Sequence, residues 1–103
     1  MPRVLTVLEA HVLPARQADL QKAYRSAAQD AFPPGLVRSS LSQATGDRTL
    51  WRIETLWESR QVLDAMRETG TPRGVQIFRD AGAEPTLTVL DVHDELSRPE
   101  GAP

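Results

Sequence analysis

Residues 36–57 read LVRSSLSQATGDRTLWRIETLW and predict a β-hairpin at the centre of the chain. One strand is expected over residues 36–43 and the other over residues 49–57, with the turn at Gly46-Asp47. Four alternate residues share one face of the second strand: Trp51, Ile53, Thr55 and Trp57. The remaining elements can be placed by working outward from this hairpin.

Upstream of the hairpin, the pattern predicts a strand followed by a helix. Residues 3–12 alternate as a strand does, and one face carries Val4, Thr6, Leu8, Ala10 and Val12. The other face carries Leu5, Val7, Glu9 and His11. Pro14 opens an amphipathic helix that continues to Ala31, because a missing N–H is harmless in a first turn. Pro33-Pro34-Gly35 then ends this helix.

Downstream, Ser59 is expected to cap a helix that Gly70 closes. Thr71-Pro72 supplies the cap and first position of a short second helix, and residues 86–96 form the last strand. The order β-α-β-β-α-β is that of a ferredoxin-like α+β domain, whose antiparallel sheet carries its helices on one face. We expect Trp51 and Ile53 to lie on the uncovered face, where a second copy of the chain would form a homodimer.

Composition limits the classes of protein that remain. The 103 residues predict one domain over residues 1–96 and a disordered tail over residues 97–103. A formal net charge of −2 with 25% charged residues argues against nucleic acid or a membrane surface as partner. The chain has no cysteine, which excludes disulfides and thiolate chemistry, and the start MPRVLTVLEAHVLP resembles no signal segment. The cytoplasm is therefore the expected location.

Few residues in this chain suit catalysis. His11 and His93 would lie at opposite ends of neighbouring strands, roughly 20 Å apart at about 3.3 Å per residue, so we expect no metal site and no cofactor. Glu9 and His11 share one strand face and are the candidate acid–base pair, although alternate charged residues on a strand more often mark a solvated surface.

The stretch TLWRIETLWESRQVLDA, residues 49–65, resembles the strand, W-E-S/D and helix centre of the antibiotic biosynthesis monooxygenase family. Pro34-Gly35-Leu36 and Thr71-Pro72 stand in the same order around it as in the family. The resemblance covers about residues 4–96. It implies an antiparallel sheet forming a dimeric α+β barrel, with an apolar pocket that takes a small-molecule substrate. Some members oxidise aromatic polyketides or quinols with dioxygen and without metal or flavin, and others degrade haem.

The family's functional positions match this chain only in part. Trp57 matches a tryptophan of the cofactor-free oxygenases, whose asparagine and aromatic partners fall on Ile53 and Leu63 here. A family arginine falls near Phe78 or Arg79. The positions that the haem-degrading branch uses hold Leu8, Met66 and Gln76 instead of asparagine, tryptophan and histidine, which argues against haem.

Three functions stay open on these residues. The first is a cofactor-independent monooxygenase acting on an electron-rich aromatic or quinol. In it Trp57 shapes the pocket, Trp51 stacks on the substrate, and Glu9 or His11 accepts a proton. The rest of its substrate site would be Leu8, Ile53, Leu63, Met66, Phe78 and Arg79. The second is a non-oxidative isomerase or lactone-handling enzyme, and the third is a non-catalytic dimer that binds a small molecule. A tryptophan at a strand end can also serve packing alone.

Overall fold

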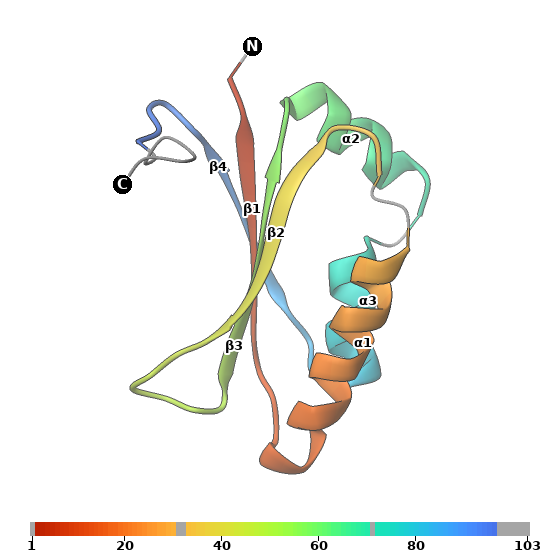
Figure 1. Cartoon of the computed structure of the whole chain (residues 1–103), viewed down its shortest axis with the longest axis vertical. Coiled ribbons are helices and arrows are strands. Elements are labelled where there is room, and N and C mark those ends of the chain that lie inside the picture. Colours follow the sequence, from red (N-terminus) through yellow and green to blue (C-terminus); the bar gives the residue numbers. More distant parts are fainter. Residues whose placement is uncertain (1, 31–32, 71, 97–103) are drawn as a thin grey trace, which may run out of the picture.

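The computed structural model describes residues 2–30, 33–70 and 72–96, and its elements follow the predicted order (Figure 1). The strands are β1 (Val4–His11), β2 (Leu36–Gln43), β3 (Leu50–Trp57) and β4 (Thr86–Asp91). The helices are α1 (Gln17–Gln29), α2 (Arg60–Glu68) and α3 (Arg73–Asp80), with a 3₁₀ turn over Pro14–Arg16 ahead of α1. The tail expected over residues 97–103 lies outside the described residues.

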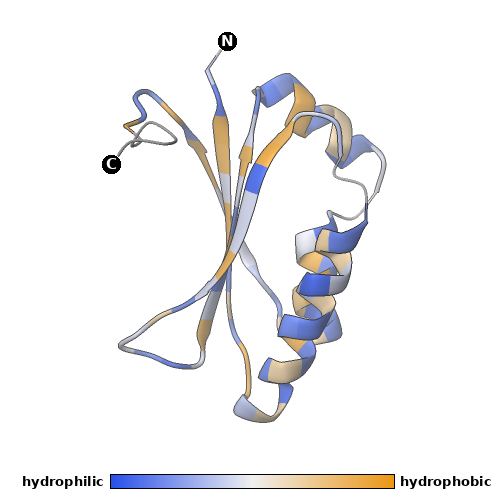
Figure 2. Cartoon of the chain, viewed as in Figure 1, coloured by the Kyte–Doolittle hydropathy of each residue, from blue (hydrophilic) through white to orange (hydrophobic). Residues whose placement is uncertain are grey.

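The four strands form one antiparallel sheet in the order β2-β3-β1-β4. Figure 1 shows the three helices on one side of this sheet, and no described helix lies on the other side, which is here called the uncovered face. In Figure 2, hydrophobic and hydrophilic bands alternate along the helices, as expected where each helix buries one side. The predicted ferredoxin-like α+β fold is confirmed.

The strand registers decide which face of the sheet meets the helices. Leu8 of β1 lies opposite Ile53 of β3, and Ala10 lies opposite Trp51. Directly opposed residues of antiparallel strands point to the same side of the sheet. That side is the helix-covered one, because Trp51 and Ile53 belong to the same buried core as Phe78 of α3. The expectation that Trp51 and Ile53 lie on the uncovered face is therefore wrong.

The physical reason lies in the two faces of β1. The face that includes Leu8 is made of apolar side chains and one threonine, whereas the opposite face includes Glu9 and His11. Burying two ionisable groups beneath helices without partners is unfavourable. The helices therefore cover the Leu8 face, and β3 adds the residues that lie opposite it.

The last strand is shorter than predicted. Its neighbour among the described strands is β1, which begins at Val4, and Val4 pairs there with Asp91. The Val92 N–H still donates to the Arg3 carbonyl at 2.9 Å. Residues further along pass the start of β1, so β4 ends at Asp91 and not at Leu96.

The helix boundaries follow local capping. The Ser59 hydroxyl accepts a hydrogen bond from the Val62 N–H at 3.2 Å, which confirms the predicted cap of α2. Asp30 already has an extended backbone and ends α1, which makes this helix shorter than predicted. The cap predicted at Thr71 lies outside the described residues, and Pro72 precedes α3. None of the described helices combines the length and apolarity that crossing a membrane requires.

Candidate functional site

A cavity of about 140 Å³ lies between the helix-covered face of the sheet and the helices. Its sheet side includes Thr6, Leu8, Ser39, Ile53, Thr55 and Trp57. Its helix side includes Tyr24, Leu63, Met66, Arg67, Arg73 and Ile77. The wall is mostly apolar, and an apolar cavity of about 150 Å³ is known to hold benzene. This cavity therefore has room for about one aromatic ring.

Five of the residues proposed from the sequence line this cavity: Leu8, Ile53, Trp57, Leu63 and Met66. Trp57 ends β3 and is only 5% exposed. Its indole Nε1–H donates to the Thr6 hydroxyl at 3.1 Å. Because an indole has one donor, Trp57 presents apolar surface to the cavity and its N–H is already bonded.

Trp51 and Phe78 are buried, but neither lines the cavity. Both belong to the main core, where Trp51 is 4% exposed and Phe78 is fully covered. The Trp51 Nε1–H has no hydrogen-bond partner among the described residues. Trp51 therefore supports the fold with its apolar area at the expense of an unsatisfied donor.

Arg79 and Glu9 form ion pairs away from the cavity. The Arg79 guanidinium donates to Glu84 at 2.9 and 3.1 Å. This hydrogen bonding raises the pKa of Arg79 and lowers that of Glu84. Glu9 lies on the uncovered face, where Arg52 donates to it at 2.7 Å, and this bond raises the pKa of Arg52.

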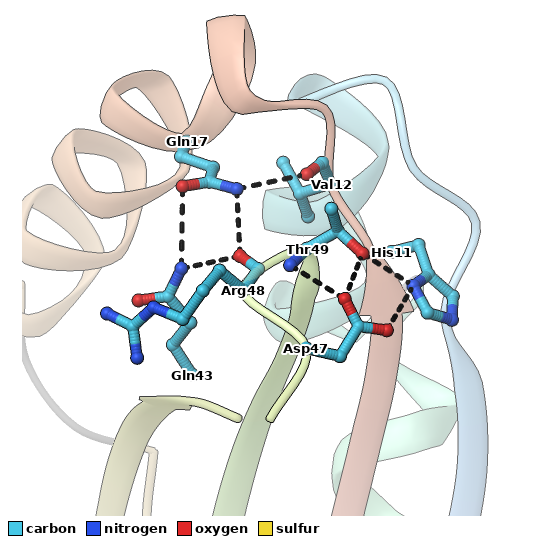
Figure 3. A network of polar contacts seen from close by, with 7 residues as sticks. All are labelled: His11, Val12, Gln17, Gln43, Asp47, Arg48 and Thr49. Atoms are coloured by element: carbon cyan, nitrogen blue, oxygen red, sulfur yellow. Dashed lines mark hydrogen bonds and ion pairs between the residues drawn. The ribbon is translucent and has the colours of Figure 1, made fainter. Parts of the chain in front are cut away.

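His11 contacts the loop between β2 and β3 (Figure 3). Its Nδ1 lies 2.9 Å from the Thr49 hydroxyl and 3.6 Å from an Asp47 carboxylate oxygen. The Thr49 hydroxyl and N–H both donate to Asp47. These two bonds hold the pKa of Asp47 below its ordinary value, and the bond from the hydroxyl has the larger effect. Figure 3 also shows Gln17 joining the start of α1 to the Arg48 carbonyl. His11 thus belongs to a polar network that fixes the hairpin loop.

The two histidines lie at opposite ends of the sheet, as predicted. His11 pairs with Leu50 at one end of β1, and His93 follows Asp91, which pairs with Val4 at the other end. Within residues 2–30, 33–70 and 72–96, no group of three or more histidine and carboxylate side chains could hold a metal ion.

Sequence reasoning missed a set of hydroxyls along the cavity wall, here called the hydroxyl chain: Tyr24, Ser39, Thr55 and Thr6. The Tyr24 hydroxyl donates to Ser39 at 2.9 Å, and the Ser39 hydroxyl lies 3.2 Å from that of Thr55. The Thr6 hydroxyl donates to the Thr55 carbonyl at 3.4 Å. The hairpin register was the available signal, because it places Ser39 opposite Thr55, on the face that also carries Trp57.

Two arginines complete the polar part of the wall. Arg67 lies in the last turn of α2 and is half-buried, and Arg73 begins α3 and is exposed. Arg73 forms an ion pair with Asp30, which follows α1. Together with Tyr24, they are the titratable groups of the described wall, which contains neither carboxylate nor imidazole.

Solved structures of the same fold match nearly the whole chain. The chain matches SnoaB, a cofactor-independent oxygenase from Streptomyces nogalater, with a TM-score of 0.70 and 18% identity over 95% of this chain and 100% of that one. For a candidate antibiotic biosynthesis monooxygenase from Caulobacter crescentus, the TM-score is 0.69 and the identity is 20% over 90% of this chain and 92% of that one. For another candidate antibiotic biosynthesis monooxygenase, from Nitrosomonas europaea, the TM-score is 0.65 and the identity is 19%, with 89% of each chain covered.

No protein-family model matches the chain, and no curated protein matches it. At 18 to 20% identity, the structural matches establish the fold alone. They support the resemblance found in residues 49–65 and place the chain in the α+β fold class of these monooxygenases.

Proposed function

We propose that the protein is a cofactor-independent monooxygenase that oxidises an electron-rich aromatic or quinol with dioxygen. The observation that carries this proposal is the ring-sized apolar cavity with the hydroxyl chain in its wall. The fold shared with a cofactor-independent oxygenase adds support.

The balance of the reaction is simple for a ring CH₂ group. The substrate loses a proton, and the resulting carbanion reduces dioxygen to a peroxide bonded at the same carbon. Loss of water then leaves a C=O group, so one oxygen atom enters the product and the other becomes water. The apolar wall excludes bulk water, and the hydroxyl chain can hydrogen-bond a ring oxygen and orient it. Since the described wall has no carboxylate or imidazole, the proposal favours substrates that are acidic themselves, such as single-ring quinols, or anthrones whose further rings extend beyond the solvent-facing end of the cavity.

Substrate binding should raise the melting temperature, because a ligand that binds the native state stabilises it. At a ligand concentration about 100 times Kd, the gain is about 2.7 kcal/mol, or several degrees for a domain of this size. We expect a stabilising quinol or anthrone to be consumed with one dioxygen per product, measured with an oxygen electrode. Stabilisation by anthrones and quinols without oxygen uptake would contradict the oxygenase.

A non-catalytic binding dimer is the second candidate, and the missing acid–base side chain in the described wall favours it. It predicts a tightly held ligand that is released unchanged from denatured protein. Mass spectrometry of that ligand after incubation in air distinguishes the two candidates. The isomerase or lactone-handling alternative requires an acid–base pair, which the described wall does not supply.

We also propose that two copies pair through the uncovered sheet face. Leu5 lies opposite both Leu56 and Leu90, so three leucines form a row across β3, β1 and β4. Leu90 is 45% exposed and Leu5 is half-buried, whereas Leu56 is already covered within a single chain. Arg52 donates to both Glu9 and Glu54 beside this row, and Arg38 lines the same shallow hollow as Glu54 and Leu56, so two arginines accompany two carboxylates within each copy. Two such faces can meet without strong repulsion.

A Leu90→Glu substitution should therefore convert a dimer into a monomer while leaving the fold intact, because Leu90 is half-exposed in a single chain. Light scattering should report a dimer for the unsubstituted protein, with an interface of roughly 2,000 Å² or more expected for a stable pair. Leu13→Glu is the matched control, since Leu13 is 72% exposed and precedes the 3₁₀ turn, away from this face. A monomeric unsubstituted protein at micromolar concentration would refute this interface.

A further inference from the structure

The cavity has two chemically different ends. Thr6 and Thr55 of the hydroxyl chain are 8% and 9% exposed, so these two hydroxyls lie at the inner end, whereas Ser39 and Tyr24 are half-buried. Arg67 is half-buried and Arg73 is exposed, so the two guanidinium groups lie at the solvent-facing end. The wall between them is apolar. A ligand that fills this cavity would meet neutral hydroxyls inside and positive charge outside.

Arg67 has no carboxylate partner in the part of the chain that the structure describes. Arg60 on the same helix pairs with Asp64 at 3.3 Å, which is ordinary for an exposed helical arginine. Arg73 uses one of its donors on Asp30, and a guanidinium has five. The guanidinium of a half-buried arginine that lines an apolar cavity is complementary to a planar anion such as a carboxylate.

The N-terminal end of α3 adds to the same preference. Arg73, Gly74 and Val75 of its first turn line the cavity. First-turn N–H groups have no acceptor within their helix, and the positive end of the helix dipole favours an anion. Gly74 allows this end to approach the sheet closely, because a Cβ there would lie 2.7 Å from Leu8 Cδ1.

We propose that the substrate is an aromatic carboxylate: its ring fills the cavity, a ring oxygen contacts the hydroxyl chain, and Arg67 binds the carboxylate with help from Arg73. The proposal rests on the proposed function for the aromatic ring, and it adds the acidic group. The room for about one ring leaves the carboxylate at the solvent-facing end, where the guanidinium groups lie.

The test is calorimetric binding of two matched probes, 4-hydroxybenzoate and 4-hydroxybenzamide, to the full chain under nitrogen. The two differ mainly in charge. We expect the acid to bind about tenfold more tightly or better, since a hydrogen bond to a charged group is worth about 1.5–3 kcal/mol. The preference should shrink as salt is added. Equal affinity for the two probes, or no binding of the acid at millimolar concentration, would overturn the proposal.

Single substitutions test whether Arg67 is the arginine that binds the carboxylate. Arg67→Gln should abolish most of the preference for the acid, whereas Arg67→Lys should retain much of it because the charge remains. Arg60→Gln is the matched control on the same helix and should leave both affinities unchanged, since Arg60 does not line the cavity. Melting curves without ligand check that each variant is folded. An Arg67→Gln protein that keeps the full preference for the acid would refute the assignment.

Binding under nitrogen separates this inference from the oxygenase itself. Selective binding of the acid, with no oxygen uptake on any quinol or anthrone, would refute the proposed monooxygenase and support the carboxylate site. Oxygen uptake on neutral quinols, with no preference between the two probes, would support the monooxygenase and refute the carboxylate site.

Discussion

Replacing Gly35 by alanine should destabilise the protein by about 2–5 kcal/mol, because backbone strain and overpacking add at one position. Gly35 immediately precedes β2 and has a φ of 86°, a conformation that is unfavourable for any residue with a side chain. An added Cβ would overlap the Val62 side chain on α2. The Gly35 carbonyl also accepts the Glu58 N–H at 2.8 Å, which restrains the backbone from moving away.

Two other glycines provide matched controls for the Gly35 measurement. Gly70 has a φ of 132° and open space around it, so Gly70→Ala measures conformational strain alone, about 1–2 kcal/mol. Gly46 has open space and no positive φ, so Gly46→Ala should be nearly neutral. Adding Val62→Ala to Gly35→Ala should recover about 1 kcal/mol or more beyond additivity in denaturant unfolding. A Gly35→Ala protein as stable as Gly70→Ala would show that the overlap is relieved at no cost.

Local rules were sufficient for the order of elements and for several of their ends. Ser59 caps α2 as predicted, and β2 spans Leu36–Gln43 as predicted, since both depend on neighbouring residues. The end of β4 depends instead on where its partner strand begins. The sequence pattern of residues 86–96 alternates beyond Asp91, but β1 offers no further pairing there.

The site was harder to predict because it depends on which face of the sheet is covered. The two-residue period of a strand correctly grouped Trp51, Ile53 and Trp57 on one face of β3. The same period is compatible with either face of the sheet being buried. Placing Trp51 on the wrong side left Glu9 and His11 available as pocket residues, and the structure puts both on the uncovered face. The pairing register of three strands together shows which face of the sheet is apolar enough to be covered by the helices, and the pattern of a single strand does not.

The polar groups of the cavity come together only through tertiary packing. Tyr24 of α1 meets Ser39 of β2, fifteen residues further along the chain, because α1 packs on the side of the sheet to which Ser39 points. Helical spacing predicted only that Tyr24 lies on the buried side of its helix. Arg67 and Arg73 belong to two successive helices, α2 and α3, and an ion pair joins Arg73 to Asp30 at the end of α1. No local pattern in the sequence predicts such a meeting.

Replacing Trp57 by phenylalanine should lower the free energy of unfolding by about 1–2 kcal/mol, against about 3–5 kcal/mol for alanine. Phenylalanine keeps most of the apolar contact beside Leu63 and loses the hydrogen bond to Thr6. Since Thr6 already accepts the indole N–H, no free donor remains for a substrate or its oxygen adduct. Turnover by Trp57→Phe, measured as oxygen uptake, should therefore follow the folded fraction and stay within a fewfold of the unsubstituted protein.

Trp51→Phe is the matched control, because it makes the same change on the same face of β3, six residues earlier and within the core. Trp51 lies outside the cavity wall and its N–H has no described partner, so its replacement removes an unsatisfied donor and should disturb stability less than Trp57→Phe. Neither variant should change ligand affinity strongly. If Trp57→Phe were folded and dimeric yet about a hundredfold slower, the indole N–H would have to leave Thr6 and stabilise the reacting oxygen. Trp57 would then be a catalytic residue, and its bond to Thr6 would describe only the resting state of the site.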